Sequence, residues 1–400
     1  MMLDSPSLLN EVRAIESELI SVRRTLHKIP ELGDKLPKTK AVVCAYLKNL
    51  GIPYREMDDG DGVIAEIVGK RNGKTIAFRA DMDGLKIEEE TEVPFRSEIP
   101  GQMHACAHDV HTAILLLTAK LLLRYKENLF GRVRLLFQTG EESSTGAKKM
   151  IACGAIEGVS NVFAIHAGNL AGDTLSAGDF AILGGYVSAG KNRLTITVKG
   201  KGTHSAFPEK GNNSLLIAAK IVLAINEITK NELPLDTAAV LATTAIHGGA
   251  DQNTIPEKTT ILGSIRAQDP AVREFLTKRV EEICETVTKE AGATYAIDVI
   301  RSSQSIWNDE KTASTVADAV SKVLGLDCVK RNLPKPLMAS DDFVYFSKAL
   351  PSVYFTLHTN NPDKGITEAN HNPRFDVDES VLYKGVAAYL AIALRFLNEQ

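Results

Sequence analysis

Short, almost uninterrupted apolar runs constrain the fold of this chain most strongly, because runs of this kind are typical of strands buried on both faces. Helical stretches at about 112–127 and 145–153 separate three of the runs, and a strand (SVYFTLH) followed by a helix at about 379–397 repeats the order near the end. The order predicts an α/β fold with a mainly parallel sheet and helices on both faces. The runs are VIAEIVG (63–69), TIAFRA (75–80), VRLLFQ (133–138) and NVFAIH (161–166).

The first 80 residues add two expected helices and a turn. Ser7 can cap a helix that runs to about Ile29, where Pro30 ends it, and a second helix is expected at about 38–50, before Gly51. Asn72-Gly73 lies between the first two apolar runs, which predicts a strand, a turn and a second strand.

The pattern changes from about residue 190. Strand, helix, two strands, helix and strand follow one another within about 110 residues, which is the β-α-β-β-α-β order of a ferredoxin-like unit. A chain of 400 residues is also long for one core. We therefore expect a discontinuous catalytic domain (1–188 and 304–400) and an inserted domain (189–303). The segments of the inserted unit are NRLTITVKG, SLLIAAKIVLAINEITK, AAVLATTAIHG, TTILGSIRA, PAVREFLTKRVEEICETVTKEAG and TYAIDVIRS.

Composition excludes several classes of partner. The net charge of −4 gives no basic face for nucleic acid and no polybasic patch for a membrane. We expect no membrane span, because no apolar stretch approaches the roughly 20 residues needed. The N-terminus has an early acid where a signal peptide has a basic region. Five scattered cysteines indicate reduced thiols and a cytoplasmic location.

Residues able to bind metals or move protons gather where the predicted strands end. Asp81 and Asp83 follow one strand, Glu141 and Glu142 follow the next, and His166 ends a third. Ligand sites in open α/β sheets form at the carboxyl ends of strands, so these side chains should meet at one edge. The run MHACAHDVH (103–111) precedes a helix, and His371 lies in the loop EANHNPRFD of the same domain.

These residue types indicate a site for two metal ions. The thiol and imidazoles suit Zn²⁺ or a neighbouring transition metal, and a glutamate adds a carboxylate oxygen. Five donors exceed what one catalytic ion takes from protein, so two ions sharing a bridging group fit better. The adjacent Glu141 is then available as general base. We expect His104, Asp109 and His111 to orient ligands, and His27, His247 and His358 to be structural. The five expected ligands are Cys106, His108, Glu142, His166 and His371.

Ordered sequence blocks over nearly the whole chain resemble the amidohydrolase branch of metallopeptidase family 20. That branch includes hippurate hydrolases, N-acyl-amino-acid amidohydrolases and plant auxin-conjugate hydrolases. The blocks are RRTLHKIPELG, FRADMDGLKIEEET, MHACAHDVHTA, FQTGEESSTGAKKM, VKGKGTHSAFP, GGADQNTIPE, GSIRA, SDDF and HNPRFDVDE.

The resemblance assigns roles to single residues. It implies two metal ions held by the five ligands above, Glu141 as catalytic base and Asp83 as the aspartate that orients a ligand. His204 matches a histidine that hydrogen-bonds the tetrahedral intermediate, often across a dimer, while Asn253 and Arg266 match residues that hold the substrate carboxylate. The inserted domain would be a lid or dimerisation domain, and we expect a homodimer through an edge strand such as TITVKG or TTILGSIRA.

The expected reaction is hydrolysis of the amide bond of an N-acyl amino acid. Zn²⁺ is favoured by the thiolate ligand, while Mn²⁺, Co²⁺ or Ni²⁺ could occupy the same site. A dipeptidase or aminopeptidase using the same centre is the alternative enzyme, and an inactive binding homologue is the alternative from another class. Departures from the family pattern surround the pocket, so the sequence does not assign the acyl group or the amino acid of the substrate. They include Ala107 in place of Gly and Thr139-Gly140 in place of Pro-Ala.

Overall fold

The structure is a computed structural model that describes residues 5–398. The chain forms two compact units. The first comprises the residues up to Val187, Trp307–Leu337 and the residues from Asp341 on, and the second comprises Ser188–Ile306 with Met338–Ser340. Each unit has its own hydrophobic core.

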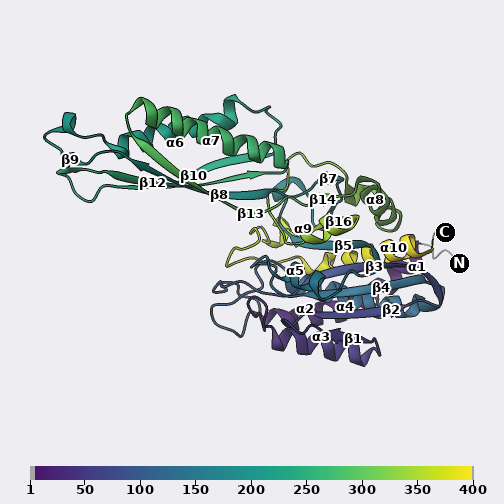
Figure 1. The fold of residues 1–400 in the computed structure, drawn as a ribbon. Coiled ribbons are helices and arrows are strands. Elements are labelled where there is room, and N and C mark those ends of the chain that lie inside the picture. The colour runs from purple at the N-terminus through teal and green to yellow at the C-terminus, as the bar shows by residue number, and fades with distance from the viewer. Residues whose placement is uncertain (1–4, 399–400) are drawn as a thin grey trace. The chain divides into compact units, whose positions relative to one another are not determined.

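The first unit is built on an eight-stranded sheet with the order β1-β2-β4-β3-β5-β16-β6-β15 (Figure 1). The neighbours β4, β3, β5 and β16 run parallel to one another, so the mainly parallel α/β fold is confirmed. Its strands are β1 (Tyr54–Glu56), β2 (Val63–Val68), β3 (Arg71–Asp81), β4 (Phe130–Gln138), β5 (Val159–Gly168), β6 (Phe180–Ala181), β15 (Val329–Lys330) and β16 (Ser352–His358), with a separate pair, β7 (Gly185–Tyr186) and β14 (Trp307–Asn308).

Helices cover both faces of this sheet. Every residue of β16 and the last six of β3 are buried, which requires cover on both sides. Helices α4 and α10 pack on β3 and on each other, while α5 packs on β4 and α9 on β16. The helices are α1 (Ser5–Arg13), α2 (Glu16–His27), α3 (Pro37–Asn49), α4 (His108–Tyr125), α5 (Gly146–Ala152), α8 (Glu310–Leu324), α9 (Val344–Ala349) and α10 (Tyr383–Asn398).

Two local predictions for this unit are wrong. The single helix expected to begin at Ser7 is two helices, because α1 packs against α8 and α10 whereas α2 packs against α4. The strands β2 and β3 do not pair, because β4 lies between them and bonds to both. Asn72 and Gly73 therefore belong to β3 rather than to a turn.

The last helix belongs to the core. By length and composition the segment Glu379–Asn398 could cross a membrane, although we expected no such segment. However, 72% of its apolar window is buried inside the protein. Tyr389 illustrates its place, since its hydroxyl accepts from Ile165 N at 2.9 Å and donates to Arg79 O at 3.2 Å. The apolar composition of this helix is accounted for by packing.

The second unit is a four-stranded antiparallel sheet with two helices on one face (Figure 1). The sheet order β10-β12-β8-β13 confirms the β-α-β-β-α-β prediction. The predicted edge strands are wrong, because β8 and β12 are the two central strands and β10 and β13 are the edges. The elements are β8 (Gly190–Lys199), β9 (Thr203–His204), α6 (Ser214–Asn231), β10 (Ala239–Gly248), β11 (Thr254–Ile255), β12 (Lys258–Ala267), α7 (Pro270–Glu290) and β13 (Thr294–Ser303).

Candidate metal centre and active site

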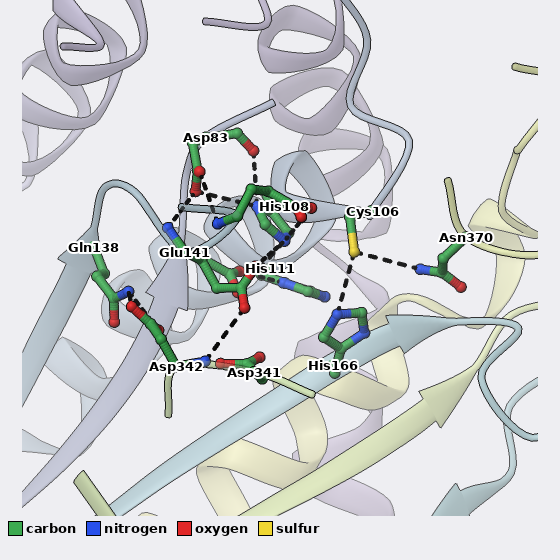
Figure 2. Close-up of polar contacts among 12 residues, drawn as sticks. Asp83, Cys106, His108, His111, Gln138, Glu141, His166, Asp341, Asp342 and Asn370 are labelled. Carbon is green, nitrogen blue, oxygen red and sulfur yellow. Dashed lines mark hydrogen bonds and ion pairs between the residues drawn. The ribbon is translucent and has the colours of Figure 1, made fainter. Parts of the chain in front are cut away.

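Three parallel neighbours, β4, β3 and β5, deliver the polar residues of the first unit to one edge of the sheet (Figure 2). Asp81 is the last residue of β3 and His166 lies near the end of β5. The glutamate pair begins three residues after the end of β4. Helix α4 begins at His108, so the run expected to be a loop already enters the helix there. The parallel pairing is what brings residues far apart in sequence together.

Cys106, His108 and His166 form one group of donor atoms. One atom from each lies within 4.8 Å of the others, and Cys106 Sγ is 3.5 Å from His166 Nε2. The Nδ1 of His108 is 2.7 Å from Asp83 O, and the Nδ1 of His166 is 3.0 Å from Ala167 O. A carbonyl oxygen only accepts, so each Nδ1 carries the hydrogen and donates. Each Nε2 can therefore offer its lone pair to a metal.

A second group shares the thiol. Cys106, Glu142 and His371 also place donor atoms within 4.8 Å of one another. His371 Nε2 is 3.4 Å from Glu142 Oε1. His371 has a left-handed backbone with φ of 71°, and its N–H donates to Ala105 O at 2.7 Å. That hydrogen bond ties the His371 loop to the segment that carries Cys106.

Backbone geometry between the first two donors is also unusual. Ala107 has φ of 64°, a left-handed conformation that is costly for a residue with a Cβ. It is fully buried and stands immediately before helix α4. Strain of this kind is retained where the surroundings enforce it. Here it sets the directions in which Cys106 and His108 leave the chain.

These donors fit divalent metal ions. Among residues 5–398, His108 Nε2 and Glu142 Oε1 are buried atoms without a hydrogen-bond partner. Burial, and then the charge of Glu142, raises the pKa of the Cys106 thiol well above its ordinary value. A thiol in such surroundings becomes a ligand only when a cation replaces its proton. Sulfur, imidazole nitrogen and carboxylate oxygen together are a donor set for Zn²⁺ or a neighbouring transition metal.

Asp83 organises the loop that carries the two glutamates. Its Oδ1 accepts from Glu141 N and its Oδ2 from Glu142 N, each at 3.1 Å, while its carbonyl accepts from His108. Burial raises the pKa of the Asp83 carboxyl, and the charges of Glu142 and Asp81 act in the same direction. Asp83 therefore connects the loop of the two glutamates, through its carboxylate, to the His108 ring, through its carbonyl.

Glu141 has a different environment from Glu142. Its Oε1 accepts from Asp342 N at 3.3 Å, and Asp341 and Asp342 form a carboxylate cluster with it. Burial raises the pKa of Glu141 well above its ordinary value, and the charges of Asp341 and Glu142 raise it further. Both glutamates also come within 4.8 Å of the His108 ring nitrogen. Only Glu142 is in addition grouped with Cys106 and His371.

Of the three residues expected to orient ligands, His111 makes the clearest contacts. Its Nδ1 lies 2.5 Å from Asp81 Oδ1, and its Nε2 accepts from Ala167 N at 2.7 Å. The ring therefore bridges the end of β3 to the residue after His166. Neither ring nitrogen of His104 has a hydrogen-bond partner among the described residues, and burial lowers the pKa of His104 to about 3.

Asp109 contacts residues on helix α2. It accepts from Arg23 Nε at 2.8 Å and lies 2.8 Å from His27 Nδ1. Both of these partners are buried. Asp109 thus anchors the first turn of α4 to α2, which differs from the expected hydrogen bond to a ligand.

Sequence reasoning missed the group around Arg79. This guanidinium is buried and bonds Asp81 at 2.6 Å, Asp341 at 3.1 Å and Asp342 at 2.9 Å. An arginine inside the apolar run TIAFRA was the available signal, because a buried charge is almost always paired. Asn370, next to His371, was also missed. Its amide donates to Ala167 O at 3.3 Å and approaches Cys106 Sγ at 4.0 Å.

The remaining predicted residues belong to the second unit. Strand β9 pairs His204 with Thr254 of β11, and Ser205 N donates to Asn253 O at 2.8 Å, so His204 and Asn253 share one small ribbon. The Nδ1 of His204 accepts from Ala206 N at 3.0 Å, which leaves Nε2 as the N–H donor of the neutral ring. Arg266 lies on β12.

Residues 77–395 match the family described as peptidase family M20/M25/M40. The chain belongs to this family. It is 35% identical to thermostable carboxypeptidase 1 of Saccharolobus solfataricus over 98% of both chains. It is 33% identical to N-acetyl-L-cysteine deacetylase of Bacillus subtilis, over 96% of this chain and 89% of that protein.

A solved relative is described as a dinuclear metal-binding peptidase of the M20 family from Bacillus subtilis. The two structures agree with a TM-score of 0.81 at 29% identity, over 96% of this chain and 99% of the other. Together with the donor groups, the family makes this chain a metal-dependent amide hydrolase that uses two divalent metal ions.

The geometry before Glu141 gives a stability prediction. Gly140 has φ of 64°, and a Cβ on it would overlap Asp34 Oδ1 and lie 2.9 Å from Thr145 Oγ1. Gly140→Ala should therefore lower the free energy of unfolding by about 1–3 kcal/mol, from the left-handed backbone and the overlap. Urea unfolding of Gly140→Ala, Asp34→Ala and the double variant measures both parts.

The double variant should regain the stability that Gly140→Ala loses through the overlap with Asp34. It should still show the loss that comes from the left-handed backbone. Additive effects of the two substitutions would contradict a clash with Asp34. A Gly140→Ala chain as stable as the parent would contradict both parts.

Proposed function

We propose that this protein hydrolyses the amide bond of N-acyl amino acids, releasing a carboxylic acid and a free amino acid. One observation carries the proposal: Glu141, a buried carboxyl with a raised pKa, lies beside a set of metal-donor atoms. The relative named as an N-acetyl-L-cysteine deacetylase adds support, because its name describes an enzyme that acts on an N-acyl amino acid.

In the proposed mechanism Glu141 moves the proton. Its raised pKa makes its carboxylate a stronger base, so it can take a proton from the attacking water and give it to the leaving amine. The hydrogen bond from Asp342 N to Oε1 holds the carboxylate in one orientation. Bound divalent ions would supply Lewis acidity and a lowered water pKa at the five proposed ligands, Cys106, His108, Glu142, His166 and His371.

Groups of the second unit are proposed to act on the substrate. His204 offers its Nε2–H, the kind of donor that stabilises an oxyanion. Arg266 is proposed to hold the substrate carboxylate, and a guanidinium suits that group because it can donate two parallel hydrogen bonds. Within one chain Asn253 lies beyond the first residue of β12 and Arg266 near its last, roughly 25 Å of extended strand apart. Asn253 is therefore proposed to reach the same carboxylate from the partner subunit of the proposed dimer. These roles follow from the resemblance of three segments, VKGKGTHSAFP, GGADQNTIPE and GSIRA, to the family pattern.

Peptide hydrolysis is the second candidate, because a relative is named as a carboxypeptidase. A peptide cut at its last bond and an N-acyl amino acid share a C-terminal carboxylate and the same amide. Both substrates would use Glu141 and Arg266 in the same way. An aminopeptidase or dipeptidase needs a further group for a free α-amine. Assays with N-acetyl, N-benzoyl and dipeptide substrates of one amino acid separate these reactions.

We also propose the identity of the metal and the compartment of the protein. Zn²⁺ is our first choice because a thiolate, Cys106, is among the proposed ligands, while Mn²⁺, Co²⁺ and Ni²⁺ suit the same donors. A cytoplasmic location is proposed because all five cysteines are free.

The two neighbouring glutamates should give different variants. Glu141→Gln should keep both metal ions and lose about 10²–10⁴-fold or more in kcat, because the base is gone and the ligands remain. Glu142→Gln should reduce the metal content. Metal analysis of each purified variant, together with kcat, measures both effects. Exchanged phenotypes would show that the two roles are reversed.

Arg266 should matter only for substrates with a free carboxylate. Arg266→Ala should raise KM for an N-acetyl amino acid and leave KM for its carboxamide analogue little changed. Arg301→Ala is the control, since Arg301 is an exposed arginine of the same unit that pairs with Glu274. An equal rise in KM for the N-acetyl amino acid and for its carboxamide would show that Arg266 does not bind the substrate carboxylate.

We also propose a homodimer through the second unit, whose edge strands β10 and β13 each leave one side unpaired in the described chain. If His204 acts across the dimer, mixing inactive His204→Ala and inactive Glu141→Gln subunits should restore activity, because some heterodimers hold one complete site. Native mass spectrometry establishes that subunits have exchanged. If the heterodimers form and show no activity, His204 either acts in the site of its own subunit or has no catalytic role.

A further inference from the structure

Three cations gather on the face of the second unit's sheet that its helices do not cover. Lys191 and Arg193 lie on β8 and Arg266 on β12. Arg266 stands directly opposite Lys191, and Arg193 stands opposite Ser264, two residues along β12. Directly opposed side chains on one sheet face have Cβ atoms about 5 Å apart, and diagonal ones are within reach of long side chains. The three charges therefore form one group.

The alternation of burial identifies this face. The neighbours Asn192 and Leu194 are buried, whereas Arg193 is exposed and Lys191 is half-buried. Leu194 and Ile265 belong to the core that packs under α6 and α7. Side chains of alternate residues point to opposite faces, so the three cations point away from the helices.

This group has no acidic partner. Among residues 5–398, no carboxylate lies within 4.0 Å of the charged atoms of Lys191, Arg193 or Arg266, whereas the neighbouring Arg301 pairs with Glu274 at 3.0 Å. Burial, and then the charges of Arg266 and Arg193, lowers the pKa of Lys191. Like charges placed side by side on a sheet are destabilising. The arrangement is thus unfavourable until an anion binds.

Apolar side chains border the group on both sides. Val240 pairs with Arg266 across one strand boundary and is 44% exposed. Ile300 pairs with Arg193 across the other and is 50% exposed. Two exposed hydrophobic residues beside three cations suit an organic anion that has a carbon chain better than a small inorganic ion.

We propose that Lys191 and Arg193 bind a second carboxylate of the substrate, beside the carboxylate held by Arg266. This inference rests on the proposed function, which gives Arg266 the first carboxylate. One guanidinium can bond one carboxylate through two hydrogen bonds, so Lys191 and Arg193 are left over for another negative charge. The preferred substrates are then N-acyl amino acids with two carboxylates, the second lying on the amino-acid side chain or on the acyl group.

Two matched substrate pairs locate the second carboxylate. N-acetyl-glutamate against N-acetyl-glutamine tests the amino-acid side, and N-succinyl-leucine against N-succinamoyl-leucine tests the acyl side. Hydrogen bonds to charged groups contribute about 1.5–3 kcal/mol, so kcat/KM should favour the diacid of one pair by roughly 10–100-fold. The pair that shows the preference identifies the side of the amide on which the charge lies.

The variant Lys191→Met/Arg193→Gln tests the two residues. The ratio of kcat/KM for diacid over neutral analogue should fall to about 1, mainly through KM of the diacid. Arg301→Gln, a charge change on the neighbouring strand β13, should keep the parent ratio. Thermal unfolding checks the fold of the variant, whose stability should not fall because like charges have been removed.

The failures of the two proposals can be told apart. In one outcome, the parent protein hydrolyses the neutral analogues and shows no preference for either diacid. That result overturns the second carboxylate site and leaves the proposed function intact. An equal loss of kcat/KM on diacid and neutral analogue in the variant also overturns it. No cleavage of any of the four amides by the metal-loaded protein overturns the proposed function and this inference with it.

Discussion

The active edge of the first unit depends on one buried guanidinium. Arg79 lies in the middle of the sheet and bonds Asp81 at the end of its own strand, Gln138 at the end of β4 and the pair Asp341 and Asp342. Removing one partner of a buried charge pair costs about 3–5 kcal/mol. Arg79 therefore fixes the positions of three chain segments around the site, and one of them, through Asp342 N, holds Glu141.

One positive charge cannot balance all the carboxylates buried there. The excess negative charge affects Asp342. Burial and the charge of Asp341 outweigh the charge of Arg79 and raise the pKa of Asp342 to about 7. The excess also affects Glu141, whose pKa is raised by burial and by the charges of Asp341 and Glu142. Divalent cations bound by the thiol, imidazoles and Glu142 would compensate this charge. The same imbalance that makes metal binding favourable thus makes Glu141 a base.

Local patterns predicted the parts of this fold that depend on local physics. The apolar runs of β3, β4 and β5 identify buried strands, and the polar residues that follow them mark the edge where a site forms. The β2–β3 turn could not be predicted correctly, because a strand more than 50 residues further along the chain, β4, separates the two. The edges of the second sheet were missed for a similar reason, since strand order is set by long-range pairing. Two of the four partners of Arg79, Asp341 and Asp342, lie more than 260 residues further along the chain, so no pattern near residue 79 identifies them.

The central claim is that Cys106, His108, Glu142, His166 and His371 together hold two metal ions while Glu141 stays unbound. Anomalous diffraction from crystals of the Zn²⁺-loaded protein, recorded on both sides of the zinc absorption edge, tests it most directly. The account predicts two zinc peaks in each chain, contacted by those five side chains, with Glu141 bonded to neither ion. A single peak, or two peaks that use Glu141 in place of Glu142, would contradict it.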